Sequence, residues 1–273
     1  MAIRLLALDV DGTITNSRNQ ITPATADAIR RAMDAGLTVA LNTGRDLSES
    51  RQVLDVVPEI PYLMGCTGAY LMDLRSGRRL ISHALDAALA REAYAILRRC
   101  DTMVNLYMDD RVYNDSWALR EFDRFYPPAL RSVMNGHIGV PDLGALLAAR
   151  EAPVDKYYVM FADEAEHRRA MEQMRALPLF VTRAAFLDME IMHAEANKGA
   201  ILRDLAELLG LDMAEVAAVG DSENDAPMLR AAGVSVAMGN AKPAVQALAA
   251  TVAPRSDDDG LAWAIDRILK EAV

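Results

Sequence analysis

The stretch Leu5-Leu6-Ala7-Leu8-Asp9-Val10-Asp11-Gly12-Thr13 is an apolar segment that ends abruptly in two carboxylates, a glycine and a hydroxyl. Burying a carboxylate costs several kcal/mol unless something pairs with its charge. A strand that buries its apolar side chains therefore has no packing use for two acids at its tip. The stretch predicts a buried strand whose end binds a metal ion, a phosphate, or both.

The chain on either side of this stretch alternates between strands and helices. In the first third we expect strands over residues 3–9, 37–42 and 62–66, with helices from the cap Thr22-Pro23 to Gly36 and over residues 46–56. In the last third we expect a helix from Asn197 to Gly210, strands over residues 216–220, 234–238 and 251–253, and helices over residues 224–232, from 243, and over 258–271. This alternation predicts an α/β fold with a doubly wound parallel sheet, a Rossmann-like core.

The middle of the chain breaks that alternation. Helices over residues 87–99 and 164–177 flank alternating, aromatic-rich segments such as 103–107, 111–113 and 154–161, followed by short strands at 179–182 and 187–191. This pattern is typical of a separate α+β insert. We therefore expect a core made of residues 1–84 and 191–273, with a cap domain over residues 85–190.

Composition narrows the class of partner. The net charge of −10 argues against nucleic acid or an anionic membrane as the main partner, because both need a basic surface. No stretch approaches about 18 consecutive apolar residues, and the N-terminus lacks a signal-peptide pattern. Cys66 and Cys100 have no zinc-binding spacing. We expect a cytoplasmic protein that acts on a small molecule, as a monomer or a weak homo-oligomer.

Four polar clusters follow the predicted strands or open a helix: the acids at Asp9, the run Asn42-Thr43-Gly44-Arg45, Lys198, and the run from Gly220 to Asp225. Ligands of a doubly wound sheet bind at the carboxyl ends of its strands, so these clusters should converge. Asp9 and Asp221 offer the oxygen ligands that Mg²⁺ prefers. Lys198 at a helix start, with the hydroxyl and backbone N–H groups of Thr43 and Gly44, suits a phosphoryl group.

The same residues suggest a reaction. The sequence contains no P-loop GxxxxGK[ST], no GxSxG and no HExxH, so ATPase, serine-hydrolase and zinc-protease interpretations have no support. A carboxylate is the simplest nucleophile: Asp9 would form an aspartyl-phosphate. Asp11, two residues on, would give a proton to the leaving oxygen and later take one from water.

These motifs, in order and spacing, resemble those of the haloacid dehalogenase-like phosphatases, and the insert resembles the cap of their Cof-type, sugar-phosphatase-like branch. Further matches are Gly68-Ala69, Met238-Gly239-Asn240-Ala241 and Asp259-Gly260, while Thr67 replaces the family's common Asn. The resemblance implies that Asp9 and Asp221 ligate Mg²⁺ with their side chains and Asp11 with its backbone carbonyl. It implies that Thr43 and Lys198 bind the phosphoryl group, that Asn224 contacts the phosphate or orders Lys198, and that Asp225 supports the ligands from behind.

Several simpler interpretations compete with these roles. Lys198 could be an exposed lysine of a first helical turn, and Asp225 and Glu223 could be favourable acids at a helix start. Arg45 could reach the substrate phosphate or only pair with a nearby acid. The run Asp257-Asp258-Asp259 reads as the capped start of the last helix.

We expect a Mg²⁺-dependent phosphomonoester hydrolase for a small phosphorylated metabolite, such as a sugar phosphate, phosphoglycolate or a phosphorylated cofactor. Two other functions remain open from the sequence. One is a phosphosugar mutase or other phosphotransferase built on the same core, and the other is a non-catalytic sensor that retains the fold.

Overall fold

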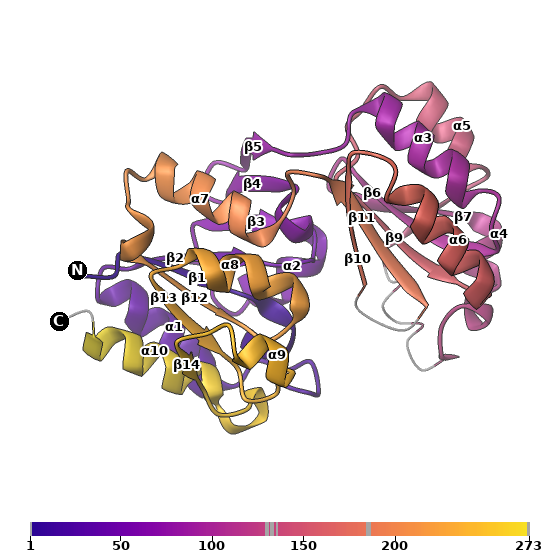
Figure 1. The fold of residues 1–273 in the computed structure, drawn as a ribbon. Helices are drawn as coiled ribbons and strands as arrows, with labels where there is room; N and C mark the ends of the chain where they lie inside the picture. Colours follow the sequence, from indigo (N-terminus) through magenta and orange to yellow (C-terminus); the bar gives the residue numbers. More distant parts are fainter. Residues whose placement is uncertain (1, 129–130, 132–133, 135, 184–186, 272–273) are drawn as a thin grey trace. The chain divides into compact units, whose positions relative to one another are not determined.

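The computed structural model of the 273-residue chain describes residues 2–128, 131, 134, 136–183 and 187–271. The chain forms two compact units, a core unit of Met1–Ser82 with Asn197–Val273 and an insert unit of His83–Ala196 (Figure 1). The insert unit extends six residues beyond the expected end at residue 190. Its last strand runs to His193, and a turn from His193 to Ala196 then closes the unit.

The core unit is built on one sheet, whose strands lie in the order β14-β13-β12-β1-β2-β3-β4-β5. Their bounds are β1 (Leu5–Leu8), β2 (Thr38–Asn42), β3 (Tyr62–Gly65), β4 (Tyr70–Asp73), β5 (Arg78–Ser82), β12 (Val216–Gly220), β13 (Val234–Ala237) and β14 (Thr251–Val252). All pairs from β14 to β3 are parallel, which confirms the predicted α/β fold with a parallel sheet. β4 and β5 are antiparallel additions at one edge that the sequence analysis did not anticipate.

Helices cover both faces of this sheet (Figure 1). Their bounds are α1 (Pro23–Asp34), α2 (Leu47–Leu54), α7 (Lys198–Leu208), α8 (Ala226–Ala231), α9 (Pro243–Gln246) and α10 (Gly260–Glu271). α7 and α8 bury their leucines against the face of β1 that carries Leu5 and Ala7. On the other face, α1 packs beside α10, and Arg31 pairs with Asp266 between them at 2.7 Å.

The helices of the core unit begin where side chains cap their first N–H groups. The Thr22 hydroxyl accepts from Thr25 N at the start of α1, and Asp46 forms a reciprocal capping box with Glu49 at the start of α2. Asn197 accepts from the N–H groups of Gly199 and Ala200 at the start of α7. These caps fix the points at which the chain turns from strand to helix beside the sheet's carboxyl edge.

The insert unit has an α+β fold built on its own six-stranded sheet, whose strands lie in the order β10-β11-β9-β6-β7-β8. Its elements are α3 (Ala87–Leu97), β6 (Thr102–Met108), β7 (Arg111–Asp115), α4 (Ser116–Arg120), β8 (Ile138–Val140), α5 (Leu143–Ala149), β9 (Lys156–Phe161), α6 (Glu164–Met174), β10 (Leu179–Thr182) and β11 (Asp188–His193). α3, α5 and α6 cover one face around a shared apolar core. On the other face, Phe122, Phe125 and Tyr126 form a smaller core with Met103.

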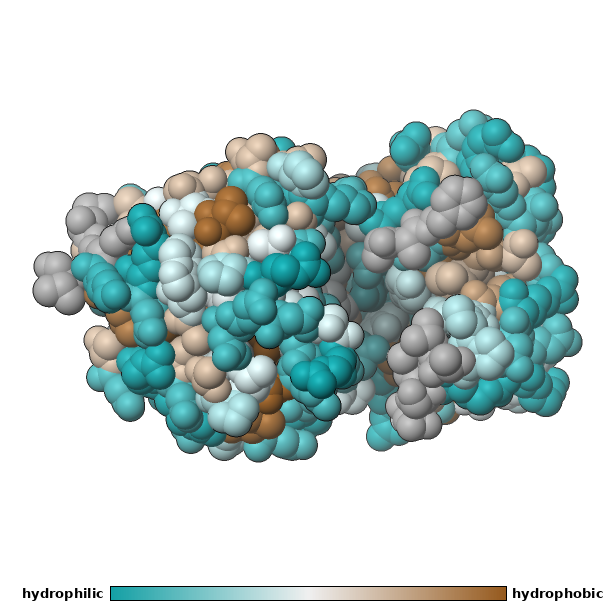
Figure 2. All heavy atoms as spheres, turned by 90° about the horizontal axis from the view of Figure 1, so that it is seen from below, coloured by the Kyte–Doolittle hydropathy of each residue, from teal (hydrophilic) through white to brown (hydrophobic). Residues whose placement is uncertain are grey.

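Hydrophilic residues cover most of the face drawn in Figure 2, and the apolar patches on it are small and scattered. Over the part of the chain that the structure describes, no helix combines the length and the apolar character needed to cross a membrane.

Candidate active site

The register of the central strands brings three of the predicted clusters to one edge of the core sheet. Leu8 of β1 lies opposite Leu41 of β2 on one side and Val219 of β12 on the other. Asp9 continues this ladder, because its N–H donates to Val219 O at 3.0 Å. Asp9, Thr43 and Asp221 therefore follow neighbouring strand ends, as parallel strands require.

A buried lysine lies between two carboxylates at this edge. Lys198 Nζ donates to Asp9 Oδ1 at 2.6 Å and to Asp225 Oδ1 at 2.5 Å. All three side chains are at most 5% exposed, so the alternative of an exposed first-turn lysine is wrong. Burial alone would lower the pKa of Lys198, but the two carboxylates outweigh it and hold the pKa above its ordinary value.

Asp225 is the anchor of this ion cluster. Its second oxygen, Oδ2, accepts from the N–H groups of Asp221 and Ser222 at 2.9 and 2.8 Å. Both oxygens are therefore engaged, and Asp225 ties the loop after β12 to Lys198. Its neighbour Glu223 is exposed, lies in the first turn of the short helix Glu223–Asp225 and pairs with Lys242, which agrees with the interpretation of Glu223 as an acid at a helix start.

Asp221 is held by a residue to which the sequence analysis gave no role. Asn240 Nδ2 donates to Asp221 Oδ2 at 2.8 Å and to Gly12 O at 2.9 Å, so it ties the loop after β12 to the loop after β1. The only signal in the sequence was the Met238-Gly239-Asn240-Ala241 match. The other oxygen of Asp221, Oδ1, is buried and has no hydrogen-bond partner among the described residues.

The donor set fits a hard divalent cation. One carboxylate oxygen each from Asp9, Asp221 and Asp225 lie within 4.8 Å of one another. Since Asp225 is fully engaged, Asp9 and Asp221 are the pair that a cation would use, and Asp221 Oδ1 is a buried oxygen in need of one. Burial raises the pKa of Asp9 and raises the pKa of Asp221 to about 7, and the negative charge of Asp225 is the second-largest cause in both cases. A bound cation would relieve both effects, and Mg²⁺ suits two carboxylates completed by phosphate and water.

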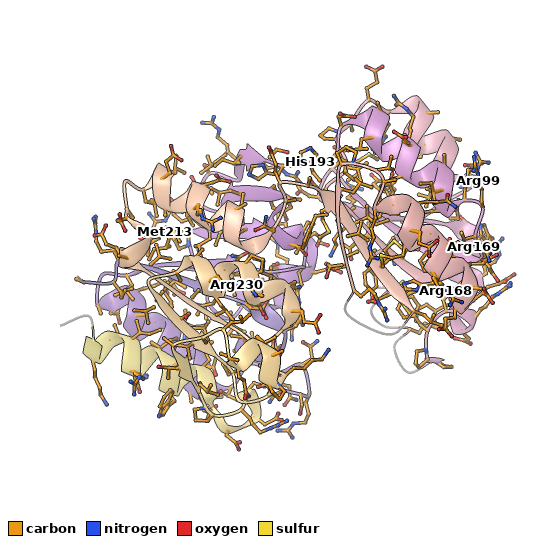
Figure 3. The ribbon with its side chains drawn as sticks, viewed as in Figure 1. Arg99, Arg168, Arg169, His193, Met213 and Arg230 are labelled. Carbon is orange, nitrogen blue, oxygen red and sulfur yellow. The ribbon has the colours of Figure 1, made fainter. Side chains whose placement is uncertain are left out.

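Asp11 lies apart from the ion cluster and pairs with Arg45. Arg45 Nε donates to Asp11 Oδ2 at 3.0 Å, and Nη2 donates to Asp11 Oδ1 at 2.6 Å. The side chain of Asp11 is 64% exposed, whereas that of Arg45 is 13% exposed. Of the two possibilities left open for Arg45, the structure has it paired with the acid. Arg99 and Arg168 of the insert unit differ from it, because their side chains are exposed (Figure 3).

Thr43 differs in detail from the expectation. Its N–H donates to Met64 O and its carbonyl accepts from Thr67 N, both at 2.9 Å. The backbone N–H of Thr43 is therefore not available to a phosphate, because it continues the pairing of β2 with β3. Its hydroxyl accepts from Arg45 N at 3.2 Å and keeps its own proton to donate, beside the half-buried Gly44.

Asn224 is not brought to Lys198. Its Oδ1 accepts from the Ser222 hydroxyl at 2.7 Å, so it shapes the loop after β12. Thr67, which stands where the family commonly has Asn, is buried with φ of +59°, and its hydroxyl has no partner among the residues that the structure describes.

Comparisons with known proteins agree with this arrangement. The sequence profile of a family described as haloacid dehalogenase-like hydrolase matches residues 6–265. The chain is 32% identical over 246 residues to an HMP-PP phosphatase from Cronobacter sakazakii, covering 88% of this chain and 85% of that protein. It is 26% identical over 283 residues to the 5-amino-6-(5-phospho-D-ribitylamino)uracil phosphatase YwtE of Bacillus subtilis, covering 98% of each.

Among solved structures, the fold is similar to that of BT1666 from Bacteroides thetaiotaomicron, which is described among phosphatases of the haloalkanoate enzyme superfamily. The TM-score is 0.81 at 26% identity, and the match covers 100% of this chain and 96% of that one. The likeness thus includes the insert as well as the core.

Proposed function

Because this chain belongs to the haloacid dehalogenase-like hydrolase family, we propose that it is a Mg²⁺-dependent phosphomonoester hydrolase working through an aspartyl-phosphate on Asp9. The observation that carries the proposal is the buried cluster in which Lys198 contacts Asp9 and Asp225 while Asp221 keeps an oxygen that no described residue contacts by a hydrogen bond. A purely structural cluster would satisfy its acids internally. This cluster instead leaves a buried oxygen of Asp221 without a hydrogen-bond donor from the described residues, close to the Asp9 carboxylate, where a cation could bind.

The proposed reaction has two halves. In the first, a carboxylate oxygen of Asp9 attacks phosphorus, the bond from phosphorus to the ester oxygen breaks, and Asp11, which enters the reaction as the carboxylic acid, gives its proton to the leaving oxygen. In the second, Asp11 takes a proton from a water whose oxygen attacks phosphorus, and the bond from phosphorus to Asp9 breaks. The products are an alcohol and orthophosphate, and both aspartates return to their starting state.

The remaining residues would hold the transferring group. Lys198 has three N–H donors and spends two on Asp9 and Asp225, so one is left for a phosphoryl oxygen. The Thr43 hydroxyl would supply a further donor, and Gly44 and Asn224 would contact the phosphate from the loops after β2 and β12. Hydrogen-bond donors held in fixed positions account for much of the rate enhancement in enzymatic phosphoryl transfer.

Mg²⁺, when bound by the side chains of Asp9 and Asp221 and the backbone carbonyl of Asp11, would offset the charge of the phosphoryl oxygens. Asn240 and Asp225 would keep those ligands in place, since residues behind metal ligands orient them.

We propose a small phosphorylated metabolite as substrate: a sugar phosphate, phosphoglycolate or a phosphorylated cofactor. The relatives support this class, because the names of those from Cronobacter sakazakii and Bacillus subtilis specify small phosphorylated compounds.

The test is orthophosphate release from a panel of small phosphate esters, with and without Mg²⁺. The wild type should release orthophosphate only with Mg²⁺, and Asp9→Asn should abolish it while Asp34→Asn, at an exposed position of α1, should not. An isomerised sugar phosphate without orthophosphate would favour a mutase instead. Full turnover by Asp9→Asn would exclude Asp9 as the nucleophile, and no turnover by the wild type on any ester would favour a sensor.

A further inference from the structure

We propose that Arg45 is a positioning residue for Asp11 and does not bind the substrate's phosphoryl group. This inference rests on the proposed function, in which Asp11 protonates the leaving oxygen. Of the two roles that the sequence left open for Arg45, contact with the substrate phosphate and pairing with a nearby acid, it favours the second.

The N–H donors of Arg45 are fully occupied by the protein. A guanidinium carries five, one on Nε and two on each terminal nitrogen. Nε and one N–H of Nη2 bind Asp11, and the other N–H of Nη2 binds Asn19 Oδ1 at 3.1 Å. Nη1 binds Glu49 O at 3.1 Å and Gln52 Oε1 at 2.9 Å. A phosphoryl oxygen would have to displace one of these partners, whereas Lys198 keeps a donor for it.

The groups around Arg45 hold the guanidinium in one plane. Glu49 and Gln52 belong to α2, whose start is fixed by the Asp46 capping box. Asn19 belongs to the loop before α1, where it adopts φ of +54° and its N–H donates to Asn16 O at 2.9 Å. Gln52 Nε2 donates to Asn19 O at 2.6 Å and joins the two sides. Arg45 is thus a preorganised fork held by two separate segments of the chain.

Asp11, in contrast, depends on Arg45 for its orientation. Its side chain is 64% exposed, and within the described part of the chain its carboxylate oxygens take hydrogen bonds from Arg45 alone. An exposed carboxylate without such a partner samples several rotamers, and a proton donor is effective only within hydrogen-bond reach of its acceptor. The bidentate fork restricts the Asp11 carboxylate to one plane. A lysine cannot replace it, because an ammonium is a point charge without fork geometry.

The leaving group of the substrate separates positioning of Asp11 from binding of phosphate. The ratio kcat/KM reports the half-reaction in which the leaving group departs. 4-Nitrophenolate leaves without a proton, whereas an alkoxide needs one. For Arg45→Met we expect kcat/KM to fall by about 10- to 100-fold on an alkyl phosphate that the wild type hydrolyses. On 4-nitrophenyl phosphate we expect a fall of less than about 3-fold, and Arg45→Lys should resemble Arg45→Met.

Three further variants complete the experiment. Arg51→Met, at an exposed arginine of α2, should match the wild type on both esters. Gln52→Ala, which removes one anchor of Arg45, should show the same selective loss on the alkyl ester at smaller size, and it serves if Arg45→Met does not fold. In an Asp11→Asn background, Arg45→Met should cause no further loss on the alkyl ester, because its effect passes through Asp11.

Equal losses on the two esters would overturn the inference in favour of phosphate binding by Arg45. Additive losses in the double variant, or no loss on either ester, would also overturn it. These outcomes presuppose an active wild type. If the wild type releases no orthophosphate from either ester, the proposed function fails, and this inference fails with it.

Discussion

Replacing Gly12 with alanine should displace Asp221 and with it the proposed cation site. A Cβ at Gly12 would lie 2.3 Å from Asp221 Oδ2 and 3.2 Å from Asn240 Nδ2. Ordinary contacts begin at 3.4 Å, so the Asp221 carboxylate has to retreat by about 1 Å. A displacement of about 1 Å at reacting groups costs about 100-fold in rate, which is the fall in kcat/KM that we expect. The Mg²⁺ concentration for half-maximal activity should rise as well.

Gly210→Ala is the matched control for this change. Gly12 has φ of +76° and Gly210 has φ of +66°, but no atom of the residues that the structure describes lies within 4 Å of a Cβ at Gly210. Both variants should lose about 1–2 kcal/mol of stability from the left-handed backbone alone. Orthophosphate release across a Mg²⁺ titration, with thermal unfolding of both variants, separates the two effects. Wild-type activity and Mg²⁺ dependence in Gly12→Ala would refute the placement of Asp221 in the cation site.

The buried acids of the candidate site lead to two further predictions, one for the pH dependence of stability and one for Asp225→Asn. Because burial raises the pKa of Asp221 from 3.8 to about 7 and also raises that of Asp9, the folded protein binds protons that the unfolded chain has released. The stability of the metal-free protein should therefore fall as pH rises from about 4 to about 7, and thermal unfolding should show a larger gain from Mg²⁺ at about pH 8 than at about pH 5. In Asp225→Asn, the amide N–H₂ faces either Lys198 Nζ or the backbone N–H of Asp221, and both of these groups are donors. The free energy of unfolding measured in urea should fall by about 3 kcal/mol. This is the low end of the range for a broken buried ion pair, because the substitution also removes the repulsion of Asp225 with Asp9 and Asp221. An unchanged urea midpoint would contradict this.

The sequence predicted the parallel core well because its signals are local. The Thr22-Pro23 cap and the glycines that follow α1 and α7 mark helix ends through backbone chemistry that needs no tertiary context. β4 and β5 escaped prediction because they are a short antiparallel hairpin whose pairing depends on β3. The acidic run before α10 also departs from expectation. Asp257 and Asp259 accept hydrogen bonds from Ser17 and Thr22, and the helix starts only at Gly260.

Some features of the candidate site could likewise be predicted from the sequence, and others could not. Residue types at the strand ends could be predicted from the chemistry that carboxylates and a helix-start lysine perform. Parallel register then brings Asp9 beside Asp221, and the start of α7 brings Lys198 to Asp9. The partners of Arg45 could not be predicted, because Asn19 and Gln52 lie outside any motif and meet it only through folding. Asn240 escaped for a similar reason, since its role exists only once two distant loops lie side by side.

The position of β1 also sets an order in time. β1 lies between β2 and β12, and β12 follows the whole insert unit in the chain. During synthesis on the ribosome, β1 can therefore pair on one side only until residues 216–220 have been made. Lys198, whose ammonium group pairs with Asp9, follows Asp9 by 189 residues in the chain. The insert unit is one continuous stretch and needs nothing from β12 to pair its strands. A nascent chain thus contains every residue of the insert unit while β1 still has an open edge, and the candidate site stays incomplete until Asp221 and Asp225 follow β12.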